Sequence, residues 1–270
     1  MCGSVIDKTR KYSLCDSCIE KFMWIKGKHC EKCGKVLEEN YTKDLCPDCF
    51  QRDHYFDKGY TCAGYGLYER SLIVDFKKGD KSYIGIILGE ILYDRIVIEN
   101  LSIDVIISVP IHKDKLKERG YNQAGIMAEE LARRLGICYR DDMLLRNKKT
   151  VPMKRLGAMD RMANLSGAFE VNPKVSMDIA GKNFLIVDDI YTTGATLDHC
   201  SKILKENHVK KVYILTFAAG NIMVRWEYNS CLGLWLKGQA SYGQKVPRKL
   251  YAGRQWSWRS LEVSPPENSD

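Results

Sequence analysis

Residues 184–197 read FLIVDDIYTTGATL, and this stretch decides the fold. The apolar run at 184–187 follows a Gly-Lys-Asn turn and predicts a short strand that is covered on both faces. Two acids stand at its carboxyl end, and the small residues after them lead into a helix expected over 196–207. In open α/β sheets, ligands bind beyond the carboxyl ends of the strands. The stretch therefore predicts a mainly parallel sheet with a binding site at this point.

The residues after this strand suit a ligand that carries both hydroxyl groups and a phosphate. Backbone amides at the start of a helix, helped by hydroxyl groups, form a cradle for an anion. The small residues predicted to form it are Thr192, Thr193, Gly194, Ala195 and Thr196. A ribose 5-phosphate meets both requirements, with Asp188 and Asp189 accepting hydrogen bonds from its 2- and 3-hydroxyls. The alternative is an ordinary helix start capped by threonines, with solvated acids.

A second polar segment follows another predicted strand, at 103–109. It covers residues 110–123, reads PIHKDKLKERGYNQ, and is expected to be a basic loop that leads into an amphipathic helix over 124–135. We expect Pro110, Arg119, Asn122 and Gln123 to hold a pyrophosphate group there. Residues 111–161 carry thirteen Lys or Arg against seven Asp or Glu, which suits a polyanionic ligand or nucleic-acid phosphates. The alternative for any single lysine is a solvated basic face.

The stretch at 184–197 resembles the phosphoribosyl pyrophosphate (PRPP) loop of type I phosphoribosyltransferases, in which a strand and two acids precede Thr-Thr-Gly-x-Thr. Over about residues 1–219 the chain resembles the ComF family of bacterial competence proteins, which are phosphoribosyltransferase-like and have cysteine-rich N-termini. The matching segments are VPIH at 109–112, ERGYNQ at 118–123, RMAN at 161–164, GAF at 167–169 and the PRPP loop. One departure is Met153, where the family usually has a glutamine.

The resemblance implies a type I phosphoribosyltransferase-like fold, with a mainly parallel sheet, helices on both faces and N-terminal zinc ribbons. It implies PRPP binding with Mg2+, catalytic roles for Asp188, Asp189 and Arg119, and a flap over 140–164 that closes over the site. It also implies a role in DNA uptake, with single-stranded DNA and other competence proteins as partners. Two alternatives stay open, namely a single-stranded DNA-binding competence module without transferase turnover and a nucleobase salvage phosphoribosyltransferase.

Eight of the eleven cysteines lie in the first 62 residues. The spacing C-x2-C-x12-C-x2-C is typical of a zinc ribbon, and its members are Cys30, Cys33, Cys46 and Cys49. Cys2, Cys15 and Cys18 each lie 31 residues before Cys33, Cys46 and Cys49, so the N-terminus is predicted to be a tandem repeat of ribbons. We expect structural zinc, because four thiolates leave no open position for catalysis.

The first ribbon lacks a counterpart of Cys30, which would fall before Met1. Three interpretations stay open, namely a true start that lies upstream, a three-cysteine site completed by His29 or Cys62, and an empty site. A metal site formed by Cys15, Cys18, Cys30 and Cys33 is also compatible with the spacing. Disulfides are disfavoured, because the chain shows no signal peptide and a reducing cytosol keeps thiols free for metal.

The length of 270 residues suits one α/β domain with a small appendage at each end. The expected divisions are a zinc-ribbon region at 1–55, a phosphoribosyltransferase-like domain at 56–220 and an aromatic, basic extension with a disordered tail at 221–270. The extension suits a stacking platform for single strands or, as the favoured interpretation, a β appendage whose aromatic residues pack. No apolar run is long enough to span a membrane, which predicts a soluble, cytoplasmic protein.

Overall fold

The computed structural model describes residue 4 and residues 10–78, 81–148, 167–175, 179–220, 246–252 and 255–261. The chain forms two compact units, Met1–Ile222 and Met223–Asp270. The second unit contains an antiparallel hairpin of β8 (Val246–Ala252) and β9 (Gln255–Leu261). The domain boundaries expected at residues 55 and 220, and the role of the extension, stay predictions.

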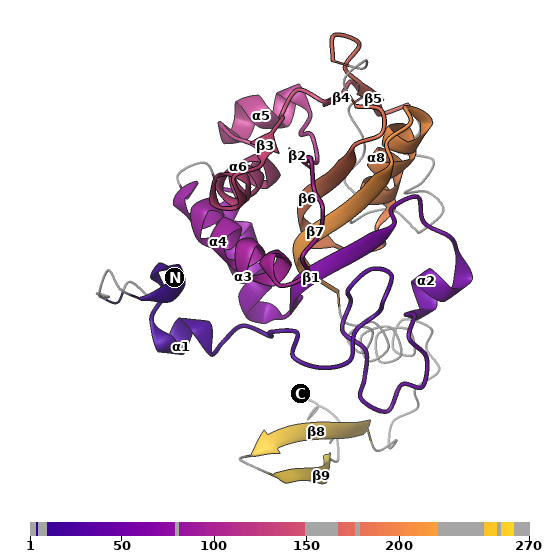
Figure 1. The fold of residues 1–270 in the computed structure, drawn as a ribbon. Coiled ribbons are helices and arrows are strands. Elements are labelled where there is room, and N and C mark those ends of the chain that lie inside the picture. Colours follow the sequence, from indigo (N-terminus) through magenta and orange to yellow (C-terminus); the bar gives the residue numbers. More distant parts are fainter. Residues whose placement is uncertain are drawn as a thin grey trace, which may run out of the picture. The chain divides into compact units, whose positions relative to one another are not determined.

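The first unit is built on a five-stranded parallel sheet with the order β1-β7-β6-β2-β3 (Figure 1). Its strands are β1 (Lys58–Gly64), β2 (Val105–Ser108), β3 (Cys138–Tyr139), β6 (Asn183–Tyr191) and β7 (Lys211–Ala219). The central strands are almost continuously buried, as expected where helices cover both faces of a parallel sheet. The predicted fold class is confirmed.

Alternate residues of β6 belong to two different cores, because successive side chains of a strand point to opposite faces. Leu185 and Val187 pack in the core on the side of α3, α4 and α6, whereas Phe184 and Ile186 pack in the core on the side of α8. Figure 1 shows these helices on the two sides of the sheet. Their bounds are α3 (Leu67–Phe76), α4 (Tyr83–Val97), α6 (Gln123–Leu135) and α8 (Ala195–Glu206).

The N-terminal region packs against both cores of the first unit. Leu14, Cys18 and Phe22 lie in the core with α4, whereas the four cysteines of the second ribbon, residues 30–49, lie in the core with α8. The short helices of this region are η1 (Lys11–Ser13), α1 (Asp16–Ile19) and α2 (Pro47–Gln51). The two halves of the predicted repeat therefore contact opposite faces of the sheet.

The segment that links the two halves, together with the start of the second ribbon, covers residues 23–34 and lies along the outer edge of β1. An isolated antiparallel bridge joins Trp24 to Ala63. Backbone hydrogen bonds run from Ile25 N to Cys62 O, from Gly59 N to Lys32 O and from Gly64 N to Met23 O. The edge strand of the sheet thus has backbone partners on both sides.

Two elements differ from the expectations. Residues expected to be a basic loop form α5 (Lys113–Arg119), because His112 Nδ1 accepts a hydrogen bond from Asp114 N at 3.2 Å and Gly120 ends the helix with a φ of 80°. The strand expected over 184–187 continues to Tyr191, because its last residues stay paired with β7, Asp188 with Thr216 and Ile190 with Ala218. The two acids therefore lie within the strand.

A small antiparallel sheet pairs β4 (Leu144–Arg146) with β5 (Phe169–Val171). The greater part of the predicted flap, including Met153, lies outside the described residues. No helix within the described part of the chain is both long and apolar enough to cross a membrane.

Candidate functional site

The two segments predicted to bind a ligand follow neighbouring strands of the sheet. The strands β2 and β6 pair in parallel from Val105 with Phe184 to Ser108 with Val187. After β2 the chain continues to α6 on one face, and after β6 it continues to α8 on the other. Such a divergence opens a crevice at the carboxyl ends of the strands, where open α/β sheets bind ligands.

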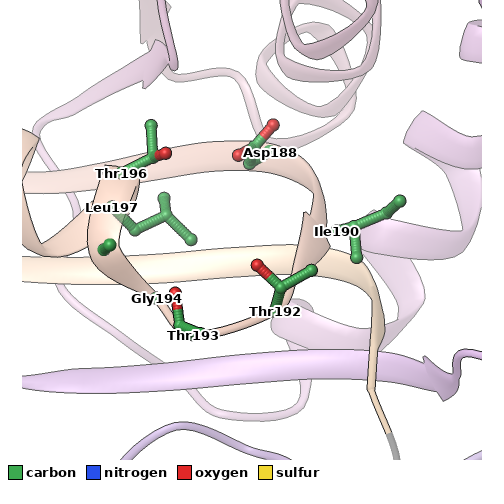
Figure 2. Close-up of a pocket in the computed structure, with 8 residues that line it drawn as sticks. Asp188, Ile190, Thr192, Thr193, Gly194, Thr196 and Leu197 are labelled. Carbon is green, nitrogen blue, oxygen red and sulfur yellow. The ribbon is translucent and has the colours of Figure 1, made fainter. Parts of the chain in front are cut away.

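A pocket lies at the turn between β6 and α8, within the segment that we call the phosphate loop, residues 188–196. Its lining residues are Asp188, Ile190, Thr192, Thr193, Gly194, Ala195, Thr196 and Leu197. Figure 2 shows Asp188 and Thr196 on one side of the turn, with Thr192 and Thr193 on the other. The first amides of α8 have no partner within a helix, and they stand at its positive end. The turn is therefore suited to an anion.

Gly194 determines the shape of this turn. Its φ is 72°, in the left-handed region that glycine adopts most readily. A Cβ atom at this position would lie 2.4 Å from the Tyr191 hydroxyl oxygen. Both the backbone conformation and the neighbouring ring thus require glycine here.

The two acids of the phosphate loop have different surroundings. Desolvation and the neighbouring Asp189 charge raise the pKa of Asp188 well above its ordinary value. Asp188 Oδ1 accepts a hydrogen bond from Asp189 N at 2.8 Å, and Asp189 Oδ2 forms an ion pair with Lys77 Nζ at 2.6 Å. Asp188 is thus a carboxylate whose charge is disfavoured until a hydroxyl donor or a cation reaches it.

Sequence reasoning missed Lys77 and Arg146. Lys77 directly follows α3, the helix that comes after β1. It reaches the site because β7 alone separates β1 from β6 in the sheet. Burial lowers the pKa of Arg146, and the nearby charge of Asp188 opposes that shift. Arg146 lies within the predicted flap at 140–164, but neither residue belongs to a motif that singles it out.

The segment after β2, which we call the pyrophosphate segment, residues 110–123, brings positive charge to the same region. Burial lowers the pKa of Lys115, and the charges of Arg146, Arg119 and Lys77 lower it further. Lys115 is thus influenced by three other basic side chains, two of which, Lys77 and Arg146, also interact with the acids Asp189 and Asp188. This basic cluster, Lys77, Lys115, Arg119 and Arg146, is suited to a ligand with several negative charges.

Side-chain hydrogen bonds fix the end of the pyrophosphate segment. Asn122 Nδ2 donates to Ser108 Oγ at 3.3 Å and to the Val109 carbonyl oxygen at 3.1 Å. Arg119 Nη1 donates to Gln123 Oε1 at 2.9 Å. Gln123 is 4% exposed, and its buried Nε2 has no hydrogen-bond partner among the described residues. The structure thus brings the predicted Arg119, Asn122 and Gln123 together around the start of α6, with Pro110 buried directly after Val109.

The cysteines of the second ribbon form one compact cluster. The sulfur atoms of Cys30, Cys33, Cys46 and Cys49 all lie within 4.8 Å of one another, and the four residues are buried. Cys33 and Cys46 are separated by 3.7 Å between sulfurs, close to the roughly 3.8 Å that tetrahedral coordination with Zn–S bonds of about 2.3 Å requires. Cys46 N also donates to Cys30 Sγ at 3.2 Å. The cluster fits a closed, structural zinc site.

The metal ligands of the first ribbon are not established by the structure. The structure places Cys30 and Cys33 with the two later cysteines and not with Cys15 and Cys18. Cys2 lies outside the described residues. Cys62 donates its thiol to the Ile91 carbonyl oxygen at 3.9 Å. Metal binding by Cys2, Cys15 and Cys18 therefore stays a prediction.

Comparisons with known proteins agree with both parts of the first unit. A phosphoribosyl transferase domain model matches residues 117–231, and a double zinc ribbon domain model matches residues 1–50. Competence protein F of Haemophilus influenzae is 29% identical over 209 residues, which cover 76% of this chain and 89% of that protein. DNA utilization protein YhgH of Shigella flexneri is 28% identical over 190 residues, which cover 68% and 81%.

Among solved structures, the glutamine PRPP amidotransferase from B. subtilis complexed with ADP and GMP matches with a TM-score of 0.34 and 20% identity. The match covers 49% of this chain and 25% of the amidotransferase chain. The present chain thus spans about a quarter of the length of that enzyme.

Proposed function

Because this chain belongs to the ComF family of phosphoribosyltransferase-like competence proteins with an N-terminal double zinc ribbon, we propose that it binds PRPP with Mg2+ and acts in DNA uptake. The observation that carries the proposal is the pocket in which Asp188 and the amides and hydroxyls of the phosphate loop share one turn. Acids and an anion cradle together match a sugar phosphate, which has both hydroxyl groups and a phosphate.

In this proposal the phosphate loop receives the 5-phosphate of PRPP. The first amides of α8 and the hydroxyls of Thr192 and Thr196 supply donors to its oxygens. Asp188 and Asp189 accept hydrogen bonds from the ribose hydroxyls, and Lys77 holds the second carboxylate in place at 2.6 Å. The raised pKa of Asp188 supports this role, since a polar ligand restores the solvation that its charge has lost.

The other three members of the basic cluster are assigned to the pyrophosphate end of the ligand. Lys115, Arg119 and Arg146 stabilise a pyrophosphate group as its negative charge grows. When bound, Mg2+ would be held mainly by ligand oxygens and waters, and it would supply further charge neutralisation of the pyrophosphate. As pyrophosphate departs, positive charge develops at the anomeric carbon, and the neighbouring carboxylates favour it. Little proton transfer by side chains is needed, and no acceptor is specified by these residues.

The proposal is tested by titration calorimetry of PRPP and Mg2+ with the wild-type protein and the Asp188→Ala/Asp189→Ala variant. We expect clear binding by the wild type and a loss of about 100-fold or more in the variant, because two hydrogen bonds to charged groups disappear. The matched control is Glu38→Ala/Glu39→Ala, which removes an exposed acidic pair and should bind as the wild type does. Absence of binding by folded, zinc-loaded wild type contradicts the proposal.

A second candidate function is single-stranded DNA binding without transferase turnover. The basic cluster favours it, because the same side chains attract nucleic-acid phosphates. Fluorescence anisotropy with a labelled oligonucleotide tests it, with PRPP as competitor. Binding that survives Asp188→Ala/Asp189→Ala while PRPP binding is lost supports a separate DNA function. Efficient turnover in a nucleobase screen would instead support salvage.

We further infer that the protein works in the cytoplasm together with other competence proteins. A reducing compartment keeps the ribbon thiols available for zinc. Cell fractionation followed by detection of the tagged protein checks this location.

A further inference from the structure

The segment that follows the second ribbon reaches the phosphate loop. Arg52, the residue directly after α2, donates a hydrogen bond from Nη2 to the carbonyl oxygen of Thr193. The two residues lie 141 positions apart in the chain. The peptide group that Arg52 holds is the one between Thr193 and Gly194, and both of these residues line the pocket.

The same segment also holds the first turn of α8. Tyr55 N donates to Asp198 Oδ1 at 2.7 Å, and His54 Nδ1 lies 3.3 Å from the same oxygen. Asp198 is 7% exposed and stands in the first turn of α8, where a carboxylate is favoured by the helix dipole. The helix whose amides face the pocket is therefore fastened to residues 54–55.

A third contact passes through the ring of Tyr191. Phe56 packs edge-on against this ring with centroids 6.3 Å apart, and Lys35 Nζ lies 5.2 Å from its centroid. Lys35 belongs to the second ribbon and pairs with Asp48 at 2.7 Å. The ring in turn occupies the space that a side chain on Gly194 would need. Phe56 and Lys35 thus hold the Tyr191 ring in place against Gly194 of the turn.

The contact of Arg52 has a directional consequence. In a trans peptide the C=O and N–H groups point in opposite directions. Because Arg52 holds the Thr193 carbonyl on the ribbon side, the Gly194 N–H points away from the ribbon. Glycine is the residue that most readily allows such a peptide to flip, and a flip would present a carbonyl oxygen where a phosphate needs donors.

We propose that the second zinc ribbon positions the phosphate loop, with Arg52 holding the Thr193–Gly194 peptide in the orientation that accepts a phosphate. The affinity of the loop for a sugar phosphate then depends on the ribbon being folded around its metal. Arg52 is a positioning residue, since it acts on the ligand through the peptide group. The choice of ligand rests on the proposed binding of PRPP, whereas the orientation of the peptide does not.

The experiment compares Arg52→Ala and Arg52→Lys with wild type by hydrogen exchange over residues 190–197 and by calorimetric titration with PRPP and Mg2+. We expect Arg52→Ala to accelerate amide exchange in this region and to weaken PRPP binding about tenfold, the scale of one charge-assisted hydrogen bond. Arg52→Lys keeps a donor and should recover part of both effects. The matched control is Lys43→Ala, which removes an exposed cation of the same ribbon that contacts the Phe50 ring.

Zinc content and melting temperature, measured on every variant, show whether the ribbon itself stays intact. Chelation of zinc from the wild type should accelerate exchange in the same residues. Unchanged amide exchange and unchanged PRPP affinity in Arg52→Ala overturn the inference. An equal loss of PRPP affinity in Arg52→Ala and Lys43→Ala also overturns it. If the wild type does not bind PRPP, the proposed function fails, and the exchange data alone still decide whether the ribbon positions the loop.

Discussion

The phosphate loop and the pyrophosphate segment lie at the ends of adjacent strands, yet they are held in different ways. Backbone shape determines the first, through the left-handed Gly194 and the Arg52 contact to the Thr193 carbonyl. Side chains hold the second, through Asn122 and the pair of Arg119 and Gln123. Steric changes should therefore damage the phosphate loop most, whereas the loss of individual polar groups should weaken the pyrophosphate segment.

Each segment also holds a charge that burial disfavours. Desolvation raises the pKa of Asp188 in the phosphate loop and lowers the pKa of Lys115 in the pyrophosphate segment. Such shifts are common where a ligand supplies the missing partners. A ligand with hydroxyl groups at one end and phosphates at the other would give a partner to the Asp188 charge and to the Lys115 charge at once.

The largest effect is expected from Gly194→Ala. The positive φ costs about 1 kcal/mol, and the new Cβ, at 2.4 Å from the Tyr191 hydroxyl oxygen, adds about 2 kcal/mol of overpacking. Urea unfolding should show a loss of about 3 kcal/mol, and calorimetry should show that PRPP binding is lost. The matched control is Gly120→Ala in the pyrophosphate segment, where φ is also positive but no atom lies within 4 Å, so that only about 1 kcal/mol is lost. Equal losses of stability in Gly194→Ala and Gly120→Ala would show that the phosphate loop is no more sensitive to steric change than the pyrophosphate segment.

An intermediate effect is expected from Asn122→Ala. The change removes the donor to Ser108 Oγ and to the Val109 carbonyl oxygen, which should cost about 2 kcal/mol in the free energy of unfolding. Exposed Asn147→Ala serves as the control and should change stability by about 0.5 kcal/mol or less. If Asn122→Ala behaves like that control in urea unfolding, side-chain hydrogen bonds do not hold the pyrophosphate segment.

The smallest effect is expected from Asp188→Asn, and it depends on pH. The raised pKa means that folded protein keeps the Asp188 proton to a higher pH than the unfolded chain does. Ionisation therefore destabilises the fold, increasingly as the pH rises from the ordinary Asp value of about 3.9 through the raised value. The variant should be about 1 kcal/mol more stable than wild type above this range and should lose that advantage as the pH falls.

Urea unfolding at several pH values measures this difference. Asp53→Asn, which removes an exposed carboxylate, is the control and should show no such trend. A difference between Asp188→Asn and wild type that stays constant with pH would show that desolvation does not disfavour the Asp188 charge.

Sequence reasoning located the strand, the turn and the second ribbon where the signal is local, while the binding roles of their residues stay predictions. The strand, acids and small residues of the phosphate loop are contiguous, and the cysteine spacing of the second ribbon already defines a compact cluster. It missed α5, since no residue of that helix is buried and its limits depend on the His112 cap and on Gly120. It also missed Lys77 and Arg146, because only the order of strands and the pairing of β4 with β5 bring them to the site.

The segment at residues 23–34 has a consequence for the protein outside its binding site. An open sheet edge offers a row of unpaired N–H and C=O groups that recruit other extended chains. Here the bridge from Trp24 to Ala63 and the bond from Gly59 N to Lys32 O cover that row along β1. A molecule that loses the order of its cysteine-rich region would uncover β1, and the sheet could then grow by one strand from a second copy of the chain. We therefore expect metal loading to protect the protein against self-association.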